Sequence, residues 1–142
     1  FGAPVDQPDK EWRAVAAALT MQERLAELNQ HRTARGEQPI HSGIGISTGE
    51  AVAGQIGSLE RLMYTVIGDA VNVAARLEAL TKDYPEHPIL INGLTAKALA
   101  ARPDLTLKSL GPINVKGRVE PVDVYAVVEW QKHDVLKSTS EQ

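Results

Sequence analysis

YTVIGDAVNVAARL, residues 64–77, changes its hydrophobic pattern at Gly68. Residues 62–67 before this glycine form a nearly continuous apolar run, which is typical of a buried strand. After the glycine, apolar side chains recur at helical spacing and make one stripe, formed by Ala70, Val73, Ala74, Leu77 and Leu80. Asp69 is suited to cap this helix. The pattern predicts a strand, a glycine turn and an amphipathic helix over residues 69–80.

Two polar residues of this helix, Asn72 and Arg76, are four positions apart and therefore share one face. Neither belongs to the apolar stripe. For an arbitrary Asn/Arg pair the usual interpretation is a solvated helix face. The functional interpretation is an amide and a guanidinium aimed together at phosphate oxygens, because the planar, permanently charged fork of Arg pairs bidentately with phosphate.

Upstream of this stretch, an amphipathic pattern predicts a helix that Asp9 caps and that ends near Arg35-Gly36. Residues 40–48 then predict a strand with Gly43 and Gly45 on one face. Glycine at alternate strand positions indicates that another backbone or a ligand comes close.

Downstream, the pattern predicts a short strand over 88–91, a short helix over 94–100, and strands over 105–110 and 122–130. The last two are joined by a loop that holds Pro112, Lys116 and Gly117. This order of elements predicts an α/β sandwich with a mixed sheet. Residues 131–142 are polar and predict a tail outside the domain of residues 1–130.

Composition excludes several classes of function. The chain has 15 basic and 18 acidic residues among 142, a net charge of −3, so nothing favours non-specific nucleic-acid binding. The absence of cysteine excludes thiol catalysis, Cys–zinc sites and disulfides. No apolar run approaches the ~20 residues that span a bilayer. We therefore expect a cytoplasmic domain that contacts neither membrane nor nucleic acid.

Other nucleotide and metal motifs fail on context. The glycines at 43, 45 and 49 are one residue off the dinucleotide fingerprint and lie in a strand instead of opening a helix. No Gly-Lys-Ser/Thr sequence follows a glycine-rich loop. The four histidines are dispersed, without the spacing of zinc ligands.

Over its whole length, the 64–77 stretch resembles the signature of class III nucleotide cyclases. In that family an aromatic residue, a purine-selecting residue and a Gly-containing turn lead into a helix with Asn and, four residues later, Arg. GIGISTG (43–49) and the segment 52–57 are similar to the strand and loop that precede the signature, and NVKG (114–117) to a loop with a phosphate-binding lysine. The resemblance runs from Phe1 to about Val128. It implies the ferredoxin-like cyclase fold, an α/β (α+β) mixed sheet with flanking helices, whose N-terminal part would precede Phe1.

Carried over by position, the resemblance implies a role for four residues. Thr65 would select the purine by a hydrogen bond to the adenine edge, where many of these enzymes have Asp and guanylate cyclases typically Cys. Asn72 would orient the ribose, and Arg76 would stabilise charge on the α-phosphate. Lys116 would hold the terminal phosphates. The implied reaction converts ATP to 3′,5′-cyclic AMP and pyrophosphate.

The resemblance also implies two divalent ions, Mg²⁺ or Mn²⁺, and a second catalytic domain paired head to tail in a homodimer. The Asp pair that binds the ions, and a Lys that partners Thr65, would lie upstream of Phe1, so no carboxylate of this chain is assigned to metal. We expect the 142 residues alone to be inactive. The alternative is an inert cyclase-like module for dimerisation or nucleotide binding, which the absence of an upstream Asp pair and Lys would favour.

Overall fold

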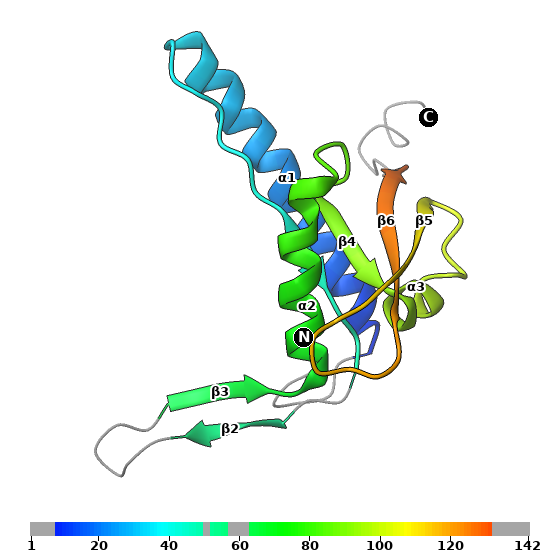
Figure 1. Cartoon of the computed structure of the whole chain (residues 1–142). Coiled ribbons are helices and arrows are strands. Elements are labelled where there is room, and N and C mark those ends of the chain that lie inside the picture. Colours follow the sequence, from blue (N-terminus) through cyan, green and yellow to red (C-terminus); the bar gives the residue numbers. More distant parts are fainter. Residues whose placement is uncertain (1–7, 50–51, 57–62, 132–142) are drawn as a thin grey trace.

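The computed structural model describes residues 8–49, 52–56 and 63–131. In chain order its elements are α1 (Lys10–Ala34), β1 (Ile44–Ile46), β2 (Val52–Ile56), β3 (Met63–Ile67), α2 (Asp69–Leu80), the 3-10 turn η1 (Thr81–Asp83), β4 (Ile89–Asn92), α3 (Gly93–Ala98), β5 (Leu105–Ile113) and β6 (Val122–Trp130). Figure 1 shows a body of sheet and helices from which α1 and the β2–β3 hairpin extend.

The body is built on a four-stranded sheet in the order β1-β4-β6-β5. β1 and β4 run parallel, while β6 pairs antiparallel with both β4 and β5. The mixed sheet with flanking helices predicted from the sequence is confirmed. β5 extends further than predicted and includes Pro112, which an edge strand tolerates because its outer N–H positions need no partner.

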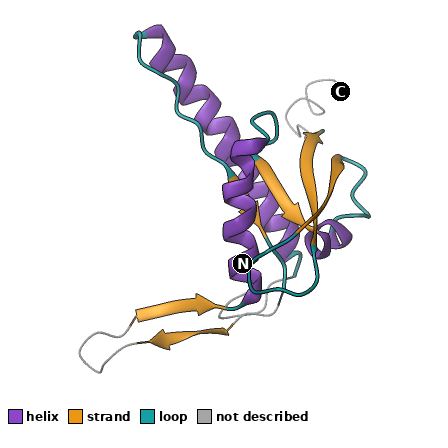
Figure 2. Cartoon of the chain, viewed as in Figure 1, coloured by secondary structure: helices purple, strands orange, loops and turns teal. Residues whose placement is uncertain are grey.

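Helices cover both faces of this sheet (Figure 2). Neighbouring residues of β4 point to opposite faces, so Ile89 and Ile91 pack with α1 and α3 whereas Leu90 packs with α2. β6 divides in the same way: Val127 joins the α1 side, and Val124 joins the α2 side. The two apolar cores therefore share the central strands.

The strand predicted over residues 40–48 is shorter in the structure, where β1 covers only Ile44–Ile46. Side chains of α1 form hydrogen bonds with the backbone of the residues just before β1. Asn29 both donates to the Ile40 carbonyl (2.8 Å) and accepts from the Ile40 N–H (2.7 Å), and Gln22 donates to the Ser42 carbonyl (2.7 Å). The backbone of this segment is bonded by side chains of a helix and not by a neighbouring strand, so the segment is not part of the sheet.

The alternating glycines mark the close approach of another backbone. A Cβ at Gly45 would lie 2.5 Å from the Glu78 nitrogen and would also overlap the Ala74 carbonyl, and a Cβ at Gly43 would overlap the Thr81 side chain. All three neighbours belong to α2 or the turn that follows it. The close neighbour is therefore a helix packed on β1.

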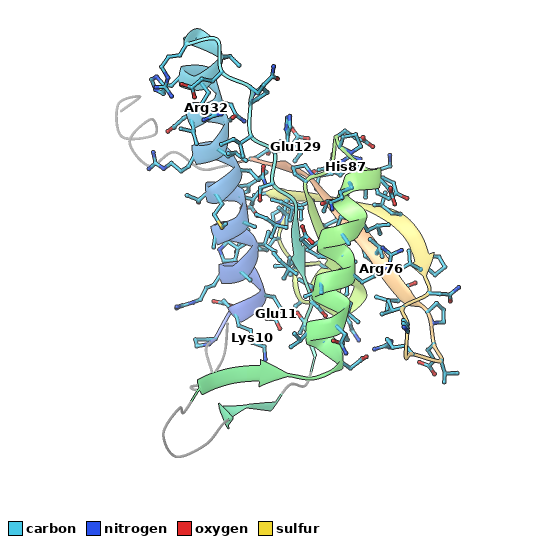
Figure 3. The ribbon with its side chains drawn as sticks, turned by 60° about the vertical axis from the view of Figure 1, so that its left-hand side comes forward. Lys10, Glu11, Arg32, Arg76, His87 and Glu129 are labelled. Carbon is cyan, nitrogen blue, oxygen red and sulfur yellow. The ribbon has the colours of Figure 1, made fainter. Side chains whose placement is uncertain are left out.

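The hairpin differs from the sequence prediction. Residues 52–56, where the pattern predicts no separate strand, form β2, which pairs antiparallel with β3 in a two-stranded sheet separate from the main one. The apolar run that predicts β3 specifies an extended strand, but it does not specify which sheet the strand joins. The hairpin projects from the body in both views (Figures 1 and 3).

The two predicted aspartate caps have different outcomes. Asp9 is the N-cap residue of α1 as predicted, but it lies in the left-handed region (φ 54°) and its side chain makes no capping hydrogen bond within the described part of the chain. The cap predicted at Asp69 is wrong. The N-cap of α2 is Gly68 (φ 153°), and Asp69 is the first helical residue. A side-chain cap occurs instead at α3, where Asn92 accepts from the N–H of Thr95. Gly36 ends α1 as predicted, with φ 77°.

Candidate functional site

The helix α2 presents two of the four candidate residues. Asn72 and Arg76 are both exposed, and Figure 3 labels Arg76 on this helix. The adjacent side of α2 is buried, with Val73 at 2% and Leu77 at 0% exposure. The predicted division of this helix into an apolar stripe and a polar face is what the structure shows.

Lys116 lies at the corner of a tight turn between β5 and β6. The N–H of Arg118 donates to the carbonyl of Val115 (3.0 Å), which closes a four-residue turn. Gly117, at its third position, has φ 88°, and Lys116 at the second position keeps a negative φ. Those are the features of a type II turn, which requires glycine at the third position. The Lys116 side chain is exposed.

Two contacts join this turn to α2. Val115 is 6% exposed and belongs to the same apolar cluster as Val73 and Leu77. Arg118 forms an ion pair with Asp69, the first residue of α2, across 49 positions of sequence. The loop of Lys116 and the helix of Asn72 and Arg76 are therefore parts of one packed unit.

Thr65 lies on β3, where it is the register partner of Gly54 on β2. Its side chain falls outside the described side chains. β3 ends at Ile67 and leads through Gly68 directly into α2, so only six residues separate Thr65 from Asn72. Connectivity alone places these two candidate residues at the same end of the molecule.

A buried polar network, which sequence reasoning missed, fixes the chain where it leaves β1. Asn92, 7% exposed, accepts at Oδ1 from the Thr48 and Thr95 N–H groups and from the Thr95 hydroxyl. Its amide nitrogen donates to the Ser47 hydroxyl and the Thr48 carbonyl. The Thr95 hydroxyl donates its proton to Asn92. In the 2.7 Å contact between the two threonine hydroxyls, Thr48 is therefore the donor. Asn92 preceding a helical segment was the available signal, since Asn is a preferred N-cap.

A cleft of about 740 Å³ opens beside this network. It lies between the segment 47–49, the start of α2 and the start of α3, and its charged lining residues are Asp69, Lys97, Arg118 and Asp123. Asn72, Arg76 and Lys116 do not line it. The three candidate side chains instead lie on an open surface, where a second molecule can contact them.

No group of three or more His, Asp or Glu side chains gathers closely enough to hold a metal ion among residues 8–49, 52–56 and 63–131. Among the helices of the described part, none is long and apolar enough to cross a membrane.

Comparison with known proteins shows which family the chain resembles. The model of the adenylate and guanylate cyclase catalytic domain matches residues 1–129. Adenylate cyclase 1 of Rhizobium meliloti is 37% identical over 128 residues, which are 90% of this chain and 19% of that protein. An adenylate cyclase of Anabaena cylindrica is 39% identical over 119 residues, which are 80% of this chain and 24% of that protein.

Solved structures of cyclases have the same fold as this chain. The adenylyl cyclase CyaB from P. aeruginosa is 32% identical with a TM-score of 0.77, over 91% of this chain and 65% of that one. The guanylyl cyclase Cya2 is 38% identical with a TM-score of 0.75, over 92% of this chain and 64% of that one. The chain thus spans less than a quarter of these two curated relatives and just under two thirds of these solved domains. By its sequence and its fold, the chain belongs to the adenylate and guanylate cyclase catalytic domain family.

Proposed function

We propose that this chain is part of an adenylate cyclase, which converts ATP to 3′,5′-cyclic AMP and pyrophosphate. The observation that carries the proposal is the outer face of α2. There Asn72 and Arg76 are exposed together on a helix whose other side is packed into the core. Packing of the helix fixes the backbone that carries both side chains before the substrate arrives, and donors positioned in advance lower reorganisation in the transition state.

In the proposed reaction the ribose 3′-oxygen attacks the α-phosphorus, loses its proton and displaces pyrophosphate. Asn72 orients the ribose, and Arg76 offsets the negative charge that grows on the α-phosphate oxygens. Lys116 holds the terminal phosphates as a point charge. The ions that assist such reactions in this family take ligands outside the described residues, and no step here is assigned to them.

ATP is the proposed substrate because Thr65 occupies the purine-selecting position. Its hydroxyl both donates and accepts hydrogen bonds, so it can read the adenine edge. The two relatives above are named adenylate cyclases, whereas the solved structures include both adenylyl and guanylyl cyclases. Thr65→Cys, combined with a change at the upstream Lys, should weaken discrimination against GTP. Unchanged preference for ATP would count against Thr65.

The proposed active unit is a head-to-tail homodimer. One subunit would present Asn72, Arg76 and the purine pocket, and the other would present the metal-binding Asp pair. Closed two-fold pairing creates two such sites by symmetry. The exposure of Asn72, Arg76 and Lys116 supports this arrangement, because each side chain is open to a partner surface.

A chimera tests the function directly. Residues 1–129 of this chain would replace the matching segment of a related adenylate cyclase domain, which then supplies the Asp pair and the Lys. We expect the chimera to form cyclic AMP from ATP with Mg²⁺ or Mn²⁺, and the 142-residue chain alone to form none. Product is measured by chromatography.

Two results would change the proposal in different ways. Turnover by the isolated chain would support the activity but show that the metal site is wrongly placed. A chimera that unfolds cooperatively and forms a dimer, yet makes no cyclic nucleotide, would favour an inert module for dimerisation or nucleotide binding. The parent cyclase domain, purified in parallel, is the positive control.

A further inference from the structure

We propose that Asp69 and Arg118 are positioning residues, whose ion pair fastens the Lys116 turn to the helix that carries Asn72 and Arg76. The inference rests on the proposed function of Lys116, Asn72 and Arg76. It adds a specific device that sets the lysine at a fixed place relative to the other two.

The turn has two attachments on opposite sides of Lys116. One residue before the lysine, Val115 is buried against the apolar stripe of α2. Two residues after it, Arg118 pairs with Asp69 and also donates from Nε to the Glu120 carbonyl (3.5 Å). If Val115 were the only attachment, the turn could still rotate about it. The ion pair of Arg118 prevents this rotation, so Lys116 lies between two attached residues.

Asp69 is suitably placed for this role. Residues 69, 72 and 76 follow one another at i, i+3 and i+7, so they lie along one face of α2. At a rise of about 1.5 Å per residue the row spans about 10 Å. The ion pair therefore anchors the lysine turn at the N-terminal end of the same row that presents the two candidate catalytic residues.

A role in stability explains the pair less well. The Asp69 side chain is 56% exposed and that of Arg118 is 30% exposed. Ion pairs this accessible to water contribute little to the folding free energy, because solvent screens them and both side chains lose conformational freedom. Loss of the pair should consequently release the turn while leaving the fold intact, and these two effects can be measured separately.

The first measurement is amide hydrogen exchange on the 142-residue chain, which needs no activity. The informative amide is that of residue 118, which donates to Val115. We expect Asp69→Asn to speed its exchange by about twofold to fivefold, the range for coupling through a partly exposed ion pair, with an unchanged melting temperature. Asp69→Glu, which keeps the carboxylate, should restore slow exchange. Arg24→Gln, which breaks the exposed Arg24–Glu27 pair on α1, is the matched control.

The second measurement is a double-mutant cycle in the chimera. Asp69→Asn and Arg118→Gln should each raise the KM for ATP by about twofold to fivefold with little change in kcat, because they loosen a contact to the terminal phosphates. Neither should have a further effect in a Lys116→Ala background, since both act through the lysine. Arg24→Gln should leave both constants unchanged.

The outcomes separate this inference from the proposed function. Exchange at residue 118 that is indifferent to Asp69→Asn overturns the ion-pair attachment. Effects of Asp69→Asn that persist in full without Lys116 overturn the positioning role. An inactive parent chimera with normal sensitivity of exchange to Asp69→Asn counts against the proposed function and leaves the attachment standing.

Discussion

Asn72 and Arg76 are each followed by a core residue, and this neighbour sets their direction. Val73 and Leu77 point into the sheet, with 2% and 0% exposure. Successive helical residues are rotated by about 100°, so burying residues 73 and 77 turns residues 72 and 76 toward the surface. The orientation of the candidate catalytic pair is therefore a consequence of core packing under α2.

Replacement of Arg76 tests its proposed catalytic role. Arg76→Ala in the chimera should lower kcat by ~100-fold or more with a modest change in KM, because the guanidinium acts mainly on charge that develops in the transition state. Melting should be unchanged, since residue 76 is exposed. Arg24→Ala, an exposed arginine on α1, is the control. An effect confined to KM would instead indicate a ground-state phosphate clamp.

Asp104 lies in a second polar cluster, on the side of the sheet covered by α1. Arg102 stacks on Trp12, with its guanidinium carbon 3.6 Å from the ring centre, and donates to Asp104 (3.1 Å). Trp12 meets Trp130 edge to face at 5.7 Å. Desolvation acts to raise the pKa of Asp104, but hydrogen bonds from Arg102, its own backbone and Trp130, with the charge of Arg102, lower it below 3.8 overall.

This shift makes folding depend on pH. Because the pKa of Asp104 is lower in the folded state, its carboxylate adds stability above pH 3.8 that is lost progressively as the pH falls through the folded pKa. Asp104→Asn should therefore destabilise the chain at neutral pH and reduce the slope of stability against pH below about 4. Urea unfolding at a series of pH values measures both effects. An unchanged slope would contradict the assignment.

At the scale of elements, the contact between β1 and α2 places the site on the sheet. α2 approaches β1 so closely that only glycine fits at position 45. A side chain there forces the helix and the strand apart, and with them the outer face of α2. The glycine pattern of residues 43–49 is thus explained by packing between two elements.

Gly45→Ala should destabilise the chain by about 1–3 kcal/mol, the usual cost of overpacking a closely fitted core. Thermal unfolding followed by circular dichroism gives the change. Gly93→Ala is the matched control, since its Cβ would meet the Asp123 Cβ at an ordinary 3.4 Å and alanine favours the helix that begins there. Equal melting temperatures for the two variants would contradict the close contact.

At the scale of the whole molecule, one sheet connects the two apolar cores. β4 and β6 contribute side chains to both, so neither core can open without disturbing the other. The only two tryptophans, Trp12 and Trp130, join the first helix to the last strand. The described body should therefore unfold as a single cooperative unit.

Denaturation followed by two probes tests that unity. Tryptophan fluorescence reports the contact between α1 and β6, and far-ultraviolet circular dichroism reports the helices and the sheet as a whole. The two urea curves should coincide in midpoint and slope, as expected for a two-state transition. Separate midpoints would show that the two cores unfold independently.

Across these scales, the sequence alone determined the family resemblance, the mixed sheet, most element positions, and the shared face of Asn72 and Arg76. These depend on periodicity and on residues close together in the chain, which local sequence records directly. The sequence prediction was wrong where a helix, and not a strand, bonds the backbone. At residues 40–43, side chains of α1 form hydrogen bonds with the backbone, so these residues do not join β1.

Only the tertiary structure decided how the parts of the surface are joined. It placed β2 and β3 in a sheet of their own, tied the end of β1 to Asn92, and paired Arg118 with Asp69 across 49 residues. Contacts at such separations leave no periodic pattern in the chain, because each partner alone is an ordinary charged or polar residue. Packing of β5, β6 and α2 around one core brings the Lys116 turn to the helix.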